Sequence, residues 1–228
     1  NLSGRPSPTE AAHVLEDLGG RIEGILEDGA VGIGVESTIV DLSEDSPTLL
    51  RPGAITIEDL EEVLGEKVAI DPTLLGKSMT EGFIPKAPGM KYRHYAPKAE
   101  MILFKKNLLS DQSQKANEIP YGEEKKLIAE AILSYGEKEL SVSPERKIWI
   151  LCGEDTASLY EGDGRFTVKI LGRREEPLSM THNLFRLLRQ ADEEGAELIL
   201  GECYSEEGVG FALMNRLKKA AGQRIFYV

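Results

Sequence analysis

The sequence has no long hydrophobic run and only two cysteines. No apolar segment of its 228 residues approaches the roughly 20 residues that a membrane-spanning helix needs, so we expect no membrane partner. Cys152 and Cys203 lie far apart and lack metal-ligand spacing, which favours a reducing intracellular compartment over a disulfide scaffold. We expect both cysteines to lie at strand ends, where they pack as small apolar residues. We also expect the protein to be cytoplasmic.

Cationic residues are scarce in the first third of the chain. Residues 1–81 hold 5 Lys and Arg against 17 Asp and Glu, and the whole chain has a formal net charge of −12. This balance argues against broad nonspecific nucleic-acid binding, which depends on a basic face that neutralises phosphates. Weak RNA binding through a local basic patch stays open. The glycine-containing loops match neither a dinucleotide fingerprint nor a phosphate loop.

One short segment reverses the sign of the charge. Residues 82–98 contain no carboxylate but four cations, Lys86, Lys91, Arg93 and Lys98. Such a segment suits a phosphate or a carboxylate, because no competing anion lies nearby in the sequence. Its three prolines exclude a long helix. An interdomain linker whose aromatic residues only pack on a neighbour explains the same features, so both interpretations stay open.

A helix is predicted after the turn-rich N-terminal run. Ser7 can cap a helix, Pro8 suits the first helical position, and Glu10 completes a capping box. Two glycines follow Leu18 and should end the helix there.

A β-hairpin and a second short helix are predicted next. β-Branched residues over 32–42 favour a strand, and 48–51 should pair with it across a polar turn. Ser37 and Thr38 interrupt this strand with hydroxyl groups. Either the two side chains simply point to opposite faces of the strand, as neighbours do, or the Ser37 hydroxyl points toward a ligand. Arg51 ends the second strand at a Pro-Gly kink, which suits an anion and a surface salt bridge equally. Thr56 should then cap a helix.

The remainder of the chain alternates short apolar runs with helical segments. This alternation predicts a parallel, doubly wound α/β sheet. The expected strands are 101–104, 147–151, 167–171, 197–200 and 224–228, and the expected helices are 123–135, 178–194 and 209–221. A chain of 228 residues is long enough for two modest domains with separate cores.

Four motifs in a fixed order resemble a known family. They occupy residues 1–9, 34–41, 50–53 and 91–97. Together they look like the two-domain form of threonylcarbamoyl-AMP synthase, the YrdC-like family form with an extra C-terminal domain. The resemblance implies a partial YrdC-like α/β twisted-sheet domain over 1–71, an interdomain linker over 72–98, and a Rossmann-like doubly wound parallel-sheet domain over 99–228.

The resemblance also implies a reaction and a set of site residues. Members of this family combine L-threonine, bicarbonate and ATP into threonylcarbamoyl-adenylate and pyrophosphate, and the adenylate serves the tRNA threonylcarbamoyl transferase machinery. Ser37 would hydrogen-bond threonine, and the linker residue Tyr95 would fold back to close the pocket. Contacts with ATP would come from Asn1, Thr9, Arg51, His94 and Tyr95.

Adenylate formation requires no nucleophile from the protein. In-line positioning and neutralisation of phosphate charge suffice, and arginine, amide donors and a magnesium ion supply both. We therefore expect Mg²⁺ to accompany ATP, with no covalent catalytic residue and no metal ligands to name.

The resemblance also bears on where the chain begins. The family's catalytic domain starts before Asn1 and contributes an upstream Lys-x-Arg pair and most of the threonine pocket. We therefore expect this chain to be the C-terminal part of a synthase and to be inactive alone. A noncatalytic nucleotide- or RNA-binding relative with the same fold is the alternative, and residues 99–228 as a purely structural or partner-docking module is a third hypothesis.

Overall fold

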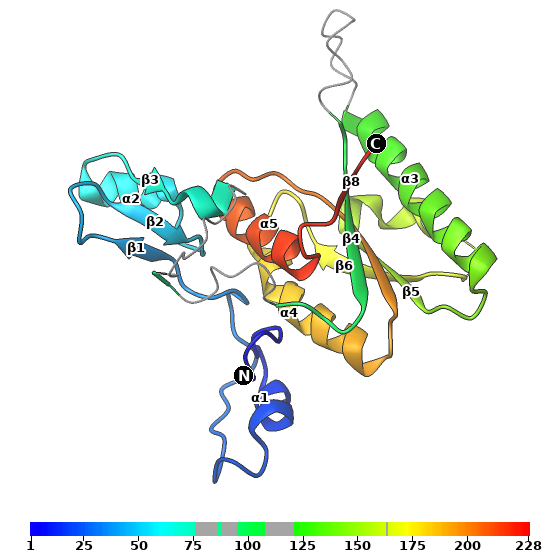
Figure 1. The fold of residues 1–228 in the computed structure, drawn as a ribbon, viewed down its shortest axis with the longest axis horizontal. Coiled ribbons are helices and arrows are strands. Elements are labelled where there is room, and N and C mark those ends of the chain that lie inside the picture. The colour runs from blue at the N-terminus through cyan, green and yellow to red at the C-terminus, as the bar shows by residue number, and fades with distance from the viewer. Residues whose placement is uncertain (76–85, 88–94, 108–120, 163) are drawn as a thin grey trace, which may run out of the picture.

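The computed structural model describes residues 1–75, 86–87, 95–107, 121–162 and 164–228 (Figure 1). Two small lobes and one larger body make up the molecule. One lobe carries the first helix, α1, and the other carries a small sheet with α2. The body is a five-stranded sheet with helices on both faces.

The small sheet follows the predicted hairpin. Its strands lie in the order β1-β2-β3, with β1 and β2 antiparallel and β2 and β3 parallel. Thr56 caps α2 in a reciprocal capping box with Asp59, as predicted. The elements are β1 (Ile39–Asp41), β2 (Thr48–Arg51), α2 (Ile57–Leu64), β3 (Ala69–Ile70) and the short 3-10 helix η1 (Pro72–Leu75).

Two predicted boundaries in this half were wrong. The strand expected over 32–42 is only β1, because the Ser37 carbonyl accepts a hydrogen bond from the Arg51 side chain instead of joining a ladder. Helix α1 (Ala11–Leu18) begins later than predicted and has no side-chain cap. The Ser7 hydroxyl donates to the Glu36 carboxylate and is not used as a cap. The helix ends at Leu18, as predicted.

The second half is the predicted doubly wound sheet. All four strand pairings are parallel, and the order is β6-β5-β7-β4-β8. The strands are β4 (Glu100–Lys105), β5 (Ile148–Gly153), β6 (Thr167–Gly172), β7 (Leu198–Glu202) and β8 (Ile225–Tyr227). The helices are α3 (Tyr121–Val142), η2 (Glu154–Leu159), α4 (Pro177–Glu193) and α5 (Val209–Ala220).

Each face of this sheet has its own buried core. On β4, Met101 and Leu103 join the cluster under α4 and α5, whereas Phe104 joins the cluster under α3. A parallel sheet needs such cover on both faces, because its strands are apolar on both sides. Cys152 and Cys203 are buried and free near the ends of β5 and β7, which confirms their predicted placement.

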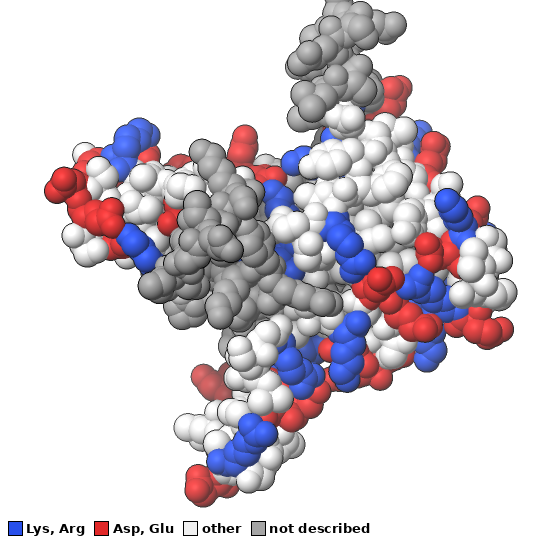
Figure 2. Space-filling view, viewed as in Figure 1, with Lys and Arg blue, Asp and Glu red and all other residues white. Residues whose placement is uncertain are grey.

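Charges of both signs are present over the visible surface. In Figure 2 acidic side chains lie at the outer end of the lobe formed by β1–β3 and α2, with cationic side chains beside them, and both signs are interspersed over the body. None of the helices in the described residues combines the length and the apolar composition that crossing a bilayer would require.

Candidate functional site

Glu36 is the point where four distant parts of the chain meet. Its carboxylate accepts hydrogen bonds from the Ser7 hydroxyl and from Arg216 Nε, the latter at 3.0 Å. Tyr95 also hydrogen-bonds this carboxylate. We call Ser7, Glu36, Tyr95 and Arg216 the Glu36 cluster.

Arg216 connects the body to the segments that precede it. Its side chain on α5 is fully buried, and Nη1 donates to the Pro52 carbonyl at 2.7 Å. The guanidinium also lies 5.7 Å from the centroid of the Tyr95 ring. A buried guanidinium is tolerated only when its donors are satisfied, so these contacts hold residues 36, 52 and 95 in one arrangement.

Ser37 and Arg51 form a second contact beside the cluster. Arg51 Nε donates to the Ser37 carbonyl at 2.9 Å, and Nη2 donates to the Ser37 hydroxyl at 3.3 Å. Among the described residues Arg51 Nη1 has no partner, and Ser37 is exposed. The pair therefore offers a cation and a hydroxyl on one open surface, which is a suitable arrangement for a ligand with an anionic group.

Burial and charge together set the protonation of the cluster. Burial acts to raise the pKa of Glu36, but Arg216 and the Ser7 hydrogen bond outweigh it and hold that pKa below its ordinary value. Burial raises the pKa of Tyr95, and the charge of Glu36 adds to this effect. At neutral pH the cluster thus contains a carboxylate and a neutral phenol. Burial, assisted by Arg216, lowers the pKa of nearby Lys219 to about 8.

A cavity of about 340 Å³ lies beside these residues but does not suit a polyphosphate. It touches Pro52 and Gly53, yet its other polar lining includes Glu58, Glu206 and Glu207. Those carboxylates would repel phosphate oxygens. The surface around Ser37 and Arg51 is the better candidate for an anionic ligand.

Family profiles match both halves of the chain. Residues 55–222 match the profile described as "Threonylcarbamoyl-AMP synthase, C-terminal domain". The chain belongs to the threonylcarbamoyl-AMP synthase family. Residues 1–53 match a further profile, described as "Telomere recombination".

Individual members of the synthase family match over the whole chain. The threonylcarbamoyl-AMP synthase of Pyrococcus abyssi is 42% identical over 228 residues, which are 100% of this chain and 58% of that protein. The synthase of Bacillus subtilis is 39% identical, over 99% of this chain and 56% of that protein. The crystal structure of P. abyssi Sua5 complexed with L-threonine has a TM-score of 0.77 at 40% identity, covering 100% of this chain and 58% of that one. These matches confirm the predicted family and fold class. The chain spans a little over half the length of these synthases.

Three of the six site residues predicted for the synthase family lie together. Ser37 and Arg51 are in direct contact, and Arg51 is close enough to Tyr95 to oppose the rise of its pKa. Within the described residues, Asn1 and Thr9 make hydrogen bonds only inside the first 31 residues. His94 lies outside the described residues.

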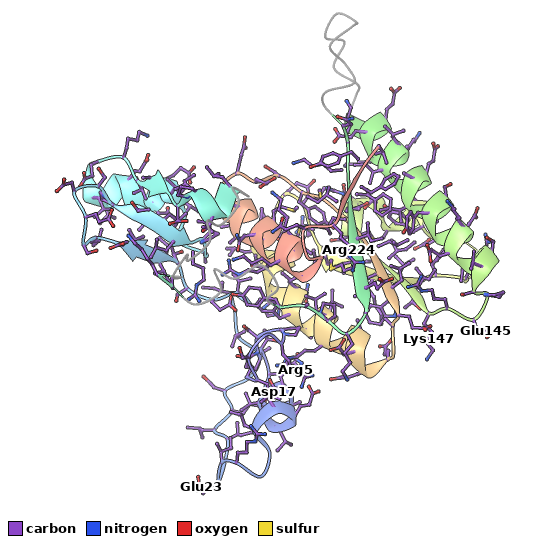
Figure 3. The ribbon with its side chains drawn as sticks, in the orientation of Figure 1. Arg5, Asp17, Glu23, Glu145, Lys147 and Arg224 are labelled. Atoms are coloured by element: carbon purple, nitrogen blue, oxygen red, sulfur yellow. The ribbon has the colours of Figure 1, made fainter. Side chains whose placement is uncertain are left out.

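A second buried arginine attaches the N-terminal lobe, which contains Asn1 and Thr9, to the body of the molecule. Arg189 on α4 donates to Asp17 Oδ2 at 2.6 Å and to the Pro6 carbonyl at 2.7 Å. Arg5 reaches the same carboxylate from within the lobe, and Figure 3 labels Arg5 and Asp17 at this junction. The first motif is therefore anchored to the body through α4.

The cationic segment before Tyr95 is described only in part. Lys86 forms ion pairs with Asp41, at 3.2 Å, and with Glu44. The prediction that this segment holds an anion also depends on Lys91 and Arg93, which lie outside the described residues. Among those that are described, no three His, Cys, Asp or Glu side chains gather as a protein metal site would require.

Sequence reasoning missed Arg216 and the role of Glu36. A signal for Arg216 was present, because it shares one helical face with Ala212 and Ala220, which are both buried. An arginine on such a face must find an acidic or carbonyl partner elsewhere. Its partner, Glu36, is 180 residues away and could not be identified from local pattern.

Proposed function

We propose that the intact protein carrying this chain makes threonylcarbamoyl-AMP from L-threonine, bicarbonate and ATP, with release of pyrophosphate. The observation that carries the proposal is the match of the whole chain, at a TM-score of 0.77, to a family structure determined with L-threonine. Because the chain covers 58% of that protein, the activity is assigned to the intact protein.

Ser37 and Arg51 take the central roles in this proposal. Ser37 is exposed and hydrogen-bonded to Arg51, so its hydroxyl is oriented to meet a polar group of threonine. Arg51 Nη1 supplies a charge-assisted donor for a phosphate oxygen of ATP. Asn1 and Thr9 are further ATP contacts in this proposal, and Tyr95, with His94, covers the nucleotide from the linker.

The reaction requires positioning and charge neutralisation. The threonine nitrogen joins bicarbonate with loss of water, which gives a carbamate. A carbamate oxygen then bonds to the α-phosphorus of ATP while the bond to pyrophosphate breaks. Mg²⁺ enters as the counter-ion of ATP, and arginine stabilises the charge that develops on the phosphates. The adenylate then leaves for the tRNA threonylcarbamoyl transferase machinery.

The buried position of the linker residue Tyr95 would protect the adenylate from hydrolysis. Tyr95 is 3% exposed, and its ring lies 5.1 Å from that of Phe185. A covered site slows hydrolysis of a mixed anhydride by excluding water. The two free cysteines are in keeping with a cytoplasmic location for this chemistry.

Pyrophosphate release by the intact protein tests the proposal. Release should require threonine and bicarbonate as well as ATP. Ser37→Ala should raise the threonine KM about tenfold, the cost of one lost hydrogen bond of about 1.5 kcal/mol. Ser134→Ala, at an exposed position of α3, is the matched control and should change nothing. Pyrophosphate release without threonine, or ATP binding with no release at all, would contradict the proposal.

A further inference from the structure

One side chain of the C-terminal half connects all four of the motifs that resemble the family. Arg216 donates to Glu36 in the second motif and to Pro52 in the third, and its guanidinium lies against the ring of Tyr95 in the fourth. Glu36 also accepts a hydrogen bond from Ser7, which belongs to the first motif. Arg216 itself lies on α5, outside all four motifs.

The contacts of Arg216 flank the predicted site residues on both sides. Glu36 immediately precedes Ser37, and Pro52 immediately follows Arg51. Arg216 Nη2 donates to the Glu36 carbonyl at 3.4 Å, and Nη1 donates to the Pro52 carbonyl at 2.7 Å. One guanidinium therefore joins the two backbone segments whose side chains form the Ser37–Arg51 contact.

Beyond the end of the small sheet, side chains replace the backbone ladder between these segments. The pairing of β1 with β2 ends where Ile39 lies opposite Arg51, so residues 36–38 and 52–53 lie outside it. Arg51 and Thr38 bridge the segments with hydrogen bonds that are exposed to solvent. The Arg216 side chain is fully buried, and a buried charge-assisted hydrogen bond is the stronger kind. Arg216 is therefore the main constraint on this part of the backbone.

Glu36 extends the effect of Arg216 to the first and fourth motifs. Its carboxylate accepts hydrogen bonds from Arg216 Nε at 3.0 Å, from the Ser7 hydroxyl and from Tyr95. Arg216 and Ser7 keep the pKa of Glu36 below its ordinary value, although burial acts to raise it. At neutral pH the group is thus an acceptor for both hydroxyls, and the position of each depends on Arg216.

We propose that Arg216 is a positioning residue of the synthase site, supplied by the C-terminal domain. It orients Ser37 and Arg51 through the backbone carbonyls beside them, and it holds Tyr95 through the aromatic ring and through Glu36. A displacement of about 1 Å at a reacting site can lower a rate about a hundredfold, so such a constraint bears directly on the synthesis. The inference rests on the proposed function, and it makes residues 99–228 part of the catalytic unit.

Arg216→Lys in the intact protein tests this role. Lysine keeps the positive charge beside Glu36, but its single ammonium group cannot join both carbonyls and the carboxylate as the planar guanidinium does. We expect ATP to bind about tenfold more weakly, because Arg51 is no longer held in place. Calorimetry with ATP alone measures this affinity, and the readout does not depend on turnover.

A second substitution shows whether the effect acts through Arg51. In an Arg51→Ala background the cation that Arg216 orients is gone, so Arg216→Lys should weaken ATP binding by only about threefold or less. That remainder is the contribution through Tyr95. A general loss of stability would not depend on Arg51 in this way.

Two further variants make the test specific. Glu36→Gln perturbs the same contact from the opposite side and should also weaken ATP binding several-fold, so the test does not depend on one variant folding. Ile132→Ala is the matched control for lost stability, because Ile132 is fully buried in the core under α3, on the other face of the large sheet from α5. It should bind ATP normally at a temperature at which urea unfolding shows it to be folded.

Three outcomes would overturn the proposal. These are normal ATP binding by both Arg216→Lys and Glu36→Gln, equal weakening by Ile132→Ala, or a full tenfold effect of Arg216→Lys in the Arg51→Ala background. Threonine-dependent pyrophosphate release by the unchanged protein is measured in parallel. Its absence would contradict the proposed synthesis, whereas its presence together with any of the three outcomes would contradict the positioning role alone.

Discussion

Arg189 and Asp17 form an ion pair across 172 residues with neither side chain exposed to solvent. Arg189 Nη2 lies 2.6 Å from Asp17 Oδ2, and Arg5 Nη1 lies 2.6 Å from Asp17 Oδ1. The pair joins α4 of the body to α1 of the N-terminal lobe. It therefore determines where the first motif lies relative to the large sheet.

Breaking this pair should destabilise the protein. Arg189→Met should lower the free energy of unfolding by about 3 kcal/mol, the low end for a broken buried pair, because Arg5 still faces Asp17. Asp17→Asn should cost a similar amount. The double variant should cost less than the sum, since it leaves no unpaired buried charge. Urea unfolding of the four proteins measures the coupling, and strict additivity would contradict it.

Gly53→Ala should disrupt the Ser37–Arg51 surface. A Cβ at Gly53 would lie 2.4 Å from the Thr38 backbone nitrogen and 2.8 Å from the Glu36 carbonyl oxygen, so the backbone itself would have to shift. We expect a loss of about 2 kcal/mol in unfolding free energy. Pyrophosphate release should also fall, as the Arg51 contacts to Ser37 lengthen. Gly122→Ala, where no atom lies within 4 Å of the new methyl, should be neutral in both assays. Unchanged release by Gly53→Ala would show that this close approach is dispensable.

Arg51 and Tyr95 should act on the same nucleotide. Arg51→Ala should weaken ATP use by removing charge-assisted hydrogen bonds, each worth about 1.5–3 kcal/mol. Tyr95→Ala should weaken ATP use and also release more adenylate to water, because it removes the ring that packs on Phe185. The two effects should be less than additive, since an open site leaves Arg51 screened by solvent.

Tyr95→Phe separates the two contributions of this tyrosine. It keeps the ring and removes the hydroxyl that bonds Glu36. Product leakage should therefore stay near that of the unchanged protein. Additive losses in the Arg51 and Tyr95 double variant, or a Tyr95→Ala variant with normal ATP dependence, would contradict this prediction. They would show that the linker only connects the two halves of the chain and does not contact the nucleotide.

Lys219 should make the free energy of unfolding depend on pH in the alkaline range. Its pKa is lowered to about 8 by burial in the folded state, whereas an unfolded lysine titrates near its ordinary value of 10.5. Between these two values the unfolded state binds more protons, so stability rises with pH through this window. Below pH 8 the full cost of burying the charge is present. Lys219→Met should therefore stabilise the protein at pH 7, by about 1–3 kcal/mol. Its advantage should shrink toward pH 10, and a constant difference between the two proteins in urea unfolding would contradict this explanation.

Local sequence was sufficient for most of the secondary structure. The alternation of apolar runs with helical segments over residues 99–228 predicted the five strands and three α-helices there, because period and burial are properties of neighbouring residues. It did not predict the 3-10 helix η2, and the helix expected over 123–135 continues to Val142. Thr56 was likewise identified as a helix cap from nearby residues alone. The four ordered motifs were enough to identify the family, and two of their residues, Ser37 and Arg51, proved to be in contact.

Long-range partners could not be obtained in this way. The pairing of Glu36 with Arg216, and of Asp17 with Arg189, depends on how three parts of the chain pack together. The hydrophobic periodicity of the sequence does not indicate which buried charges will pair. The same packing explains the two wrong boundaries. The Ser7 hydroxyl bonds the charged Glu36 carboxylate and therefore does not cap α1. The Ser37 carbonyl bonds the charged Arg51 side chain and therefore does not extend β1. A buried charge must be paired because it has lost its contact with water, and the tertiary structure alone determines which residue lies close enough to pair with it.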